Sequence, residues 1–222
     1  MKILAIDTAN NRCSAAVLVG SGETVFARSE ELNRGHAERL MGMIEEVLTE
    51  ADLSLDAMDR IAVTCGPGSF TGLRVGMSVA RGLGLALDVP VVGVSTLAAI
   101  AESVRDGQRA VAVALSARNE EVYAQKFAAD GTPDGEPAVA ILADFAADLT
   151  ADMMLAGSAA SRLAELRGDL AAPVSDGTSG SADIVAVARL ALKTAEPAGP
   201  PTPLYLRPPD AKPQTRFKIA RA

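Results

Sequence analysis

Apolar and polar positions alternate along the first half of the chain in a way that predicts strands and helices in turn. Five apolar runs are typical of strands, and they lie at 2–6, 13–19, 24–28, 60–64 and 89–94. Three segments have apolar residues at helical spacing, and they lie at 37–51, 71–87 and 96–104. The resulting order, βββαβαβα, predicts an α/β domain in which a three-stranded meander precedes two βα units.

The alternation starts again after residues 105–108, whose sequence Arg-Asp-Gly-Gln is typical of a turn between domains. Beyond it we predict strands at 110–115, 121–127, 137–142 and 153–156, and helices at 143–149, 159–166 and 182–194. Residues 171–180 are predicted to form a loop. We therefore predict a first domain at 1–106, a smaller second domain at 107–196, and a proline-rich tail at 197–222 that extends along the surface.

Charge and hydropathy exclude two classes of protein. The 222 residues include 21 basic and 28 acidic side chains, which give a formal charge of −7. A broad nucleic-acid surface needs clustered Lys and Arg, so we expect another chain to supply most contacts with any RNA. The 82–101 stretch is long enough to cross a bilayer, but Asp88 and Pro90 interrupt it. We expect a buried α/β unit there and no membrane partner.

The few cysteine and histidine residues limit the chemistry of the chain. Neither Cys13 nor Cys65 lies in a CxxC pattern, so we expect two reduced thiols and a cytoplasmic protein. The apolar run after Met1 is too short for a secretion signal and ends at Asp7. The one histidine, His36, is expected to be a solvated residue at a helix start. A zinc site or a Ser-His-Asp triad would lack partners, so we assign no catalytic residue and no metal site.

The sequence GPGSFTGLRVG at 66–76 follows a predicted strand and opens a predicted helix. The Walker and dinucleotide patterns both require a glycine where Thr71 stands, so neither is present. Backbone N–H groups of this loop would suit an anion, although a tight turn would need the same glycines. Asp7, which ends the first strand, is a candidate Mg²⁺ ligand or a cap for the following turn. The candidate nucleotide or anion contacts are Asp7, Thr8, Gly66, Gly68 and Arg74.

Small residues recur every four positions in the helix after this loop, at Gly72, Gly76, Ala80 and Gly84. Such a ridge lets another helix approach closely. The ridge serves either packing within the domain or a contact with a partner subunit. Because the same helix carries Arg74 and Arg81, such a contact would form in solution and not in a membrane. The Met41-Gly42-Met43 patch of the preceding helix has the same two interpretations, core filling or adaptable contact.

Several stretches carry a resemblance to a known family. They are ILAIDTANNRCSAAV at 3–17, GHAERLMGMIEEVL at 35–48, GPGSFTGLRVGMSVARGLGLALDVPVVGVSTLAAIA at 66–101, LSARNEEVYAQKF at 115–127 and PLYLRPPDAKPQ at 203–214. In them the chain resembles the TsaB (YeaZ) family, the non-catalytic partners of the enzyme TsaD in making N6-threonylcarbamoyladenosine (t6A) at position 37 of tRNA. The resemblance implies an actin/Hsp70/sugar-kinase-like (ASKHA) α/β fold, with two RNase-H-like domains of mixed sheets flanked by helices.

The resemblance also implies a role. TsaD carries an HxxxH metal motif, whose histidines fall at or beside Thr96 and Ile100 here, and neither residue replaces an imidazole. We therefore expect a non-catalytic adaptor that forms a heterodimer with TsaD, helps to recruit the ATPase TsaE, and pairs with a second copy when TsaD is absent. It would meet tRNA only through the complex. The chain itself would need no cofactor, with ATP or ADP expected at the interface of the complex.

Family members dock through the first helix and the helix after the glycine loop, which are 37–51 and 71–87 here. The interface residues predicted on this basis are Leu40, Met41, Met43, Ile44, Gly72, Val75, Gly76, Val79, Ala80, Leu83 and Gly84. One departure is Ser116, which stands where the family often has aspartate, so that aspartate's role does not transfer. The alternative function is a small ASKHA-type ATP-dependent phosphotransferase that uses Asp7 and the glycine loop.

Overall fold

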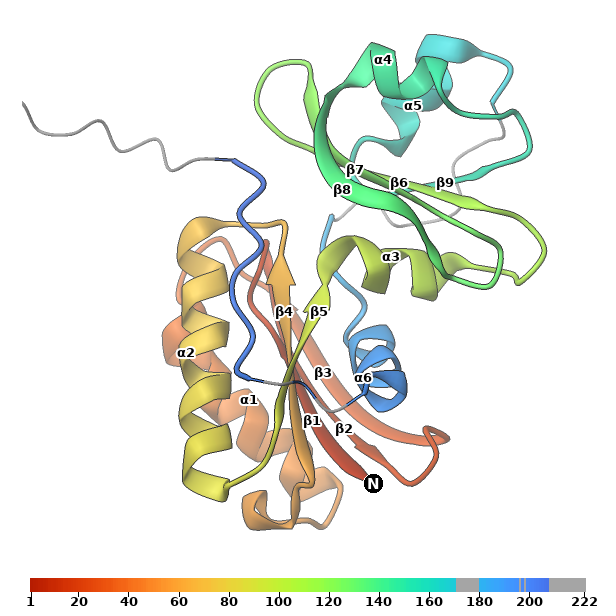
Figure 1. The fold of residues 1–222 in the computed structure, drawn as a ribbon. Helices are drawn as coiled ribbons and strands as arrows, with labels where there is room; N and C mark the ends of the chain where they lie inside the picture. The colour runs from red at the N-terminus through yellow and green to blue at the C-terminus, as the bar shows by residue number, and fades with distance from the viewer. Residues whose placement is uncertain (171–179, 196, 198, 208–222) are drawn as a thin grey trace, which may run out of the picture.

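The computed structural model describes residues 1–170, 180–195, 197 and 199–207. Two α/β bodies, each built on its own sheet, lie one above the other (Figure 1). The first sheet has the strand order β3-β2-β1-β4-β5, with β1 (Lys2–Asp7), β2 (Arg12–Val19), β3 (Thr24–Glu31), β4 (Arg60–Gly66) and β5 (Val91–Ser95). The second has the order β8-β7-β6-β9, with β6 (Val111–Ser116), β7 (Glu121–Phe127), β8 (Pro133–Ile141) and β9 (Met154–Ala156).

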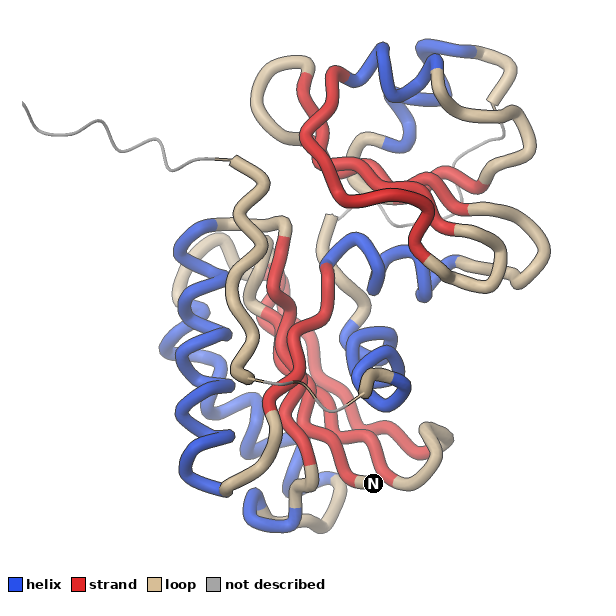
Figure 2. Tube along the Cα trace, in the orientation of Figure 1, coloured by secondary structure: helices blue, strands red, loops and turns tan. Residues whose placement is uncertain are grey.

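Helices cover both faces of the first sheet (Figure 2). The helices on one face are α1 (His36–Glu50) and α2 (Phe70–Leu87), and those on the other are α3 (Thr96–Val104) and α6 (Ile184–Lys193). Because side chains alternate along a strand, Leu4 and Ile6 of β1 face α1 and α2, whereas Ile3 and Ala5 face α6. Burial on both faces explains why β1 is apolar from Ile3 to Ile6.

The second sheet is covered on one face by α4 (Leu142–Ala147) and α5 (Ala160–Arg167). Its other face packs on α3, where Leu97 and Ile100 contact a cluster that includes Val111, Val113 and Phe127. Ala99 of the same short helix packs in the core of the first sheet, so α3 joins the two cores. A 3-10 turn, η1 (Leu55–Ala57), leads from α1 toward β4.

The position of α6 corrects the predicted domain boundary. Ile184 and Val187 of this helix pack in the same core as Ile3 of the first sheet. Arg60 of β4 donates a hydrogen bond to the backbone oxygen of Ala191 at 2.6 Å. The apolar stripe of α6 therefore serves the first body, although the chain reaches it after the second. The range 107–196 predicted for the second domain extends too far, because its last helix belongs to the first sheet.

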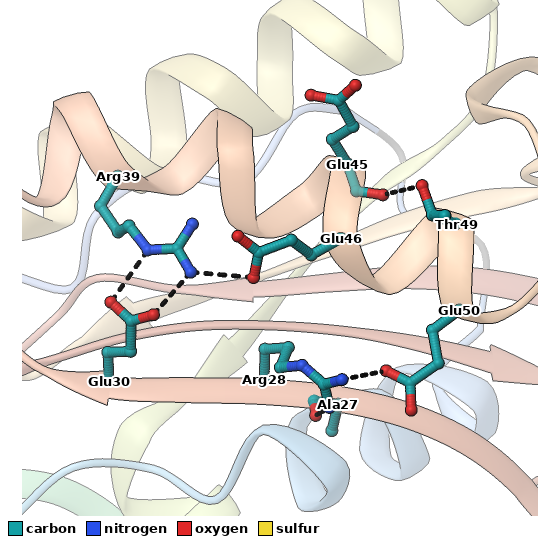
Figure 3. A network of polar contacts seen from close by, with 8 residues as sticks. All are labelled: Ala27, Arg28, Glu30, Arg39, Glu45, Glu46, Thr49 and Glu50. Atoms are coloured by element: carbon teal, nitrogen blue, oxygen red, sulfur yellow. Dashed lines mark hydrogen bonds and ion pairs between the residues drawn. The ribbon is translucent and has the colours of Figure 1, made fainter.

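Ion pairs attach α1 to the edge strand β3 (Figure 3). Arg39 donates to Glu30 of β3 through Nε at 2.9 Å and to Glu46 of its own helix through Nη2 at 2.8 Å. Arg28 of β3 pairs with Glu50 at the end of α1 at 2.7 Å. The hydrogen bonds from Arg39 hold the pKa values of Glu30 and Glu46 below their ordinary range. Charges on an exposed edge strand also discourage pairing with another sheet.

Most predicted elements are present, with shifted ends. β8 begins at Pro133, earlier than the predicted residue 137, while α3 matches its predicted range. The apolar 82–101 stretch is divided among α2, β5 and α3, and none of the helices within the described ranges is long and apolar enough to cross a membrane. The predicted loop at 171–180 lies outside the described residues except for Gly180, and so does the tail beyond residue 207.

Candidate functional site

The glycine loop between β4 and α2 packs closely on the end of β1. A side-chain carbon at Gly68 would lie 2.5 Å from the backbone oxygen of Ala9, and one at Gly72 would lie 2.0 Å from that of Thr8. Ser69 donates its backbone N–H to Ala9 at 2.6 Å, and its hydroxyl accepts from the N–H of Gly72 at 3.3 Å. These glycines allow two backbones to touch, which supports the tight-turn interpretation of the loop.

Asp7 is buried beneath this turn, with no side-chain exposure to solvent. One carboxylate oxygen, Oδ1, accepts hydrogen bonds from the Thr64 hydroxyl and from the backbone N–H of Ala9, the latter at 2.9 Å. The other oxygen has no hydrogen-bond partner among the described residues. Burial raises the pKa of Asp7, and the Thr64 hydrogen bond opposes that shift. In this structure the side chain holds the turn and is closed to a ligand in solution.

A cavity of about 760 Å³ lies between the two bodies. The β1–β2 turn, the glycine loop, the β6–β7 turn and the tail form its walls. The lining residues are Asn10, Asn11, Pro67, Gly68, Ser69, Phe70, Leu115, Ser116, Ala117, Arg118, Tyr123, Ser158, Gly180, Leu204, Tyr205, Leu206 and Arg207. Three aromatic rings and two guanidinium groups therefore border the cavity, together with amide and hydroxyl groups.

The tail segment 203–207 closes one side of this cavity. The backbone N–H of Leu204 donates to the oxygen of Cys65 at 2.7 Å. The ring centroid of Tyr205 lies 5.4 Å from that of Phe70, at the start of α2. Arg74 donates through Nε to the Tyr205 hydroxyl at 3.2 Å, and its guanidinium lies 3.8 Å from the Phe70 ring centroid. The segment thus extends along the surface, as predicted for the described part of the tail.

The five predicted nucleotide or anion contacts do not come together at one exposed place. Asp7, Thr8 and Gly66 are buried, and the Thr8 hydroxyl donates to the Gly72 oxygen at 2.7 Å. Gly68 alone among the five lines the 760 Å³ cavity. Arg74 instead lines a second hollow, a groove that Phe70 also borders. The structure therefore does not bring these five residues together as a single nucleotide site.

The small-residue ridge of α2 faces inward, which corrects its interpretation as an intermolecular contact. Gly72 and Gly76 abut Thr8, Gly84 abuts Val91, and Ala80 is fully buried. Several other predicted interface residues are buried in the core between α1, α2 and the sheet, and these are Leu40, Met43 and Ile44. Val75, Val79 and Leu83 are half-buried, and Met41 is exposed. Only these last four are accessible to a partner.

A groove runs along the accessible side of α2 and meets α1 at Ala37. Its lining residues are Ala37, Phe70, Thr71, Arg74, Val75, Ser78 and Val79. Val75 and Val79 belong to the predicted interface. The groove residues Ala37, Phe70, Thr71 and Ser78 do not. The signal was present in the sequence: Thr71, Val75, Ser78 and Gly82 have helical spacing and form the stripe opposite the ridge.

The remaining candidate groups are the two cysteines and the histidine. Cys13 and Cys65 are free thiols, and burial raises the pKa of each to about 11. His36 is half-buried at the start of α1, and not solvated as predicted, with Nε2 buried and without a hydrogen-bond partner among the described residues. The described part of the chain has no group of three or more His, Cys, Asp or Glu side chains placed to hold a metal ion.

Comparison with known proteins gives the fold and the family. Residues 28–195 match the family model described as TsaD, tRNA N6-adenosine threonylcarbamoyltransferase. The YeaZ structure from Pseudomonas aeruginosa superimposes with a TM-score of 0.76 at 31% identity, covering 92% of this chain and 99% of that one. This likeness extends over both bodies and confirms the predicted ASKHA fold class.

Two relatives differ in how much of the chain they match. The Escherichia coli tRNA threonylcarbamoyladenosine biosynthesis protein TsaB is 40% identical over 146 residues, which cover 64% of this chain. The matched segment spans 62% of the length of that relative. An uncharacterized protein of Mycobacterium tuberculosis is 38% identical over 218 residues, covering 95% of this chain and 94% of the relative.

Proposed function

Because the chain belongs to the TsaB (YeaZ) family, we propose that it acts in t6A synthesis as a non-catalytic subunit. In this role it binds and activates TsaD, helps to recruit the ATPase TsaE, and pairs with a second copy when TsaD is absent. It acts in the cytoplasm and meets tRNA through the complex. ATP or ADP at the interface of the complex belongs to the same proposal.

The observation that carries the proposal is the accessible face of α1 and α2. Large apolar side chains are exposed there: Met41 is 48%, Phe70 45% and Leu85 86% accessible to solvent. The groove along α2, which Ala37 of α1 also lines, belongs to the same face. Exposed apolar side chains beside a groove are the usual signature of a protein-binding surface. The same two helices are the docking elements that the family resemblance implied.

The non-catalytic part of the proposal is supported by the residues that stand where TsaD carries its metal-binding histidines. Thr96 and Ile100, at or beside the positions of the metal-binding histidines, are both buried in α3. The phosphotransferase alternative needs Asp7 and Thr8 at an accessible site, and their exposed fractions are 0% and 1%. A carboxylate sealed under a turn cannot reach a nucleotide without the turn opening.

A drop-out reconstitution tests the proposal. TsaD, TsaE, the enzyme that makes threonylcarbamoyl adenylate, tRNA, ATP, threonine and bicarbonate are mixed with or without this chain, and t6A in the tRNA is measured by mass spectrometry. The proposal expects product only when the chain is present, and no product from the chain alone. Equal product without the chain would overturn the proposed role. ATP turnover by the isolated chain that disappears in Asp7→Ala would establish the phosphotransferase instead.

A further inference from the structure

The tail segment 201–207 contacts both bodies of the molecule. Pro201 packs on β5, where a side-chain carbon at Gly93 would lie 2.8 Å from the Pro201 Cβ. At the other end of the segment, Arg207 forms an ion pair with Glu121 of β7, in the second sheet. Figure 1 shows the segment running along α2 toward the second body. The segment therefore links the first body to the second, in addition to the link that α3 provides.

The middle of the segment is held on the first body and forms a wall of the 760 Å³ cavity. The backbone N–H of Leu204 donates to the Cys65 oxygen at 2.7 Å, and the ring of Tyr205 packs on Phe70. All the residues from 204 to 207 line the cavity. Because the segment is attached to one body before the cavity and to the other body after it, it spans the cavity from side to side.

The cavity and the groove on α2 share one aromatic ring as a wall, because Phe70 lines both. Arg74 lines the groove, and its guanidinium lies 3.8 Å from the Phe70 ring centroid. Its Nε donates to the Tyr205 hydroxyl at 3.2 Å. One side chain of the groove therefore contacts the segment that spans the cavity. A molecule in the groove that attracts this guanidinium removes one of the contacts that hold the segment.

We propose that residues 201–207 are a strap that holds the two bodies together across the cavity, and that Arg74 couples this strap to the groove on α2. An anionic group in the groove draws the guanidinium away from Tyr205, because a charged acceptor binds arginine more strongly than a neutral hydroxyl does. The strap then loosens on the first body, and the cavity opens. By linkage, a closed cavity in turn weakens the binding of that anionic group. The inference concerns movement within this chain and does not depend on which protein occupies the groove.

A single fluorescent probe in the cavity tests the inference. The chain has no tryptophan, and Tyr123 of β7 lines the cavity from the second body. Tyr123→Trp therefore places the sole indole of the chain in that wall. Quenching of its fluorescence by acrylamide measures how easily a small solute reaches the cavity. This full-length tryptophan-bearing chain is the starting chain for every further variant, and circular dichroism confirms that each variant is folded.

The first pair of variants tests the coupling. Arg74→Met keeps an apolar stem of similar length but removes the guanidinium, so one hydrogen bond and one cation–π contact are lost. The quenching constant should rise by about twofold or more. Arg81→Met is the matched control, because Arg81 lies on the exposed side of the same helix and has no hydrogen bond or ion pair with the residues that the structure describes. It should leave the quenching constant unchanged. No rise for Arg74→Met, or an equal rise for both variants, would overturn the coupling.

A charge swap tests the attachment to the second body. Arg207→Glu places a like charge beside Glu121 and should raise the quenching constant by about twofold or more, as should Glu121→Arg alone. The double variant restores the ion pair with its charges exchanged, so its quenching constant should return close to that of the starting chain. A segment that merely lies on the first body would show no such recovery. Single variants that leave the constant unchanged, or a double variant that stays as high as the single ones, would overturn the strap.

Discussion

A side-chain carbon added to Gly72 would lie 2.0 Å from the backbone oxygen of Thr8, so α2 rests directly on the end of β1. Packing inside the chain requires glycine here. The atoms that a side chain would meet are backbone atoms of Thr8 and Ala9, which cannot move aside as the end of a flexible side chain could. Gly72→Ala should therefore destabilise the fold by about 1–3 kcal/mol or more, the usual cost of overpacking. Denaturant unfolding followed by circular dichroism measures the loss.

Gly82 of the same helix is the matched control. A side-chain carbon there would have nothing within 4 Å, and the residue is exposed. Gly82→Ala should leave stability unchanged or raise it by up to about 1 kcal/mol, since alanine favours a helix interior more than glycine does. Equal effects of the two substitutions would show that the contact between Gly72 and Thr8 does not govern stability.

The buried Asp7 predicts a specific pH dependence. Its pKa in the folded chain is raised above the ordinary value of 3.8, so the folded state retains a proton that the unfolded state has lost. Between those two pKa values the folded state binds more protons, and its stability falls as pH rises. Asp7→Asn removes this titration and retains an oxygen that accepts from Thr64. The stability of the variant relative to the natural chain should therefore increase as pH rises above 3.8.

Unfolding free energies of the natural chain and Asp7→Asn, measured in urea at a series of pH values, check this prediction. Other titrating groups are shared by both chains, so the difference between the two curves isolates Asp7. Parallel curves over the acid range would mean that the carboxyl titrates normally in the folded chain.

Tyr205 should hold the tail segment on the first body through its ring more than through its hydroxyl. Its ring packs on Phe70, and its hydroxyl accepts from Arg74. Tyr205→Ala removes both contacts and should speed hydrogen exchange at the Leu204 amide, which donates to Cys65. Tyr205→Phe retains the ring contact and should give a smaller increase. Exchange at Leu204 that is the same in all three chains would show that the aromatic contact does not hold the segment.

The fold was predictable because each strand and helix has a clear local pattern. Ile3 to Ile6 are apolar on both faces of β1, and Leu40, Ile44, Val47 and Leu48 form one stripe of α1. The position of α6 was not predictable from local pattern. Its apolar stripe specifies a buried face, but not which of two neighbouring cores receives it, because that choice depends on contacts between residues such as Val187 and Ile3 that are far apart in sequence.

The candidate site was predicted in part. The family resemblance assigns the partner interface to α1 and α2, and this assignment stays a prediction. The small residues of α2 were assigned to a partner, but they pack inside the chain, because a ridge of glycines serves a partner helix or the chain's own backbone equally well until the neighbour is known.

The most direct test of the central claim is the affinity of this chain for TsaD when the groove is altered. Val79→Glu puts an unpaired charge into the groove, and Leu166→Glu makes the same kind of change at an exposed site on α5 of the second body. Isothermal titration should show TsaD binding weakened by about a hundredfold for Val79→Glu, because an unpaired buried charge at an interface costs about 2–5 kcal/mol. Leu166→Glu should bind like the natural chain. Natural affinity in both variants would contradict the claim that the face of α1 and α2 binds the partner.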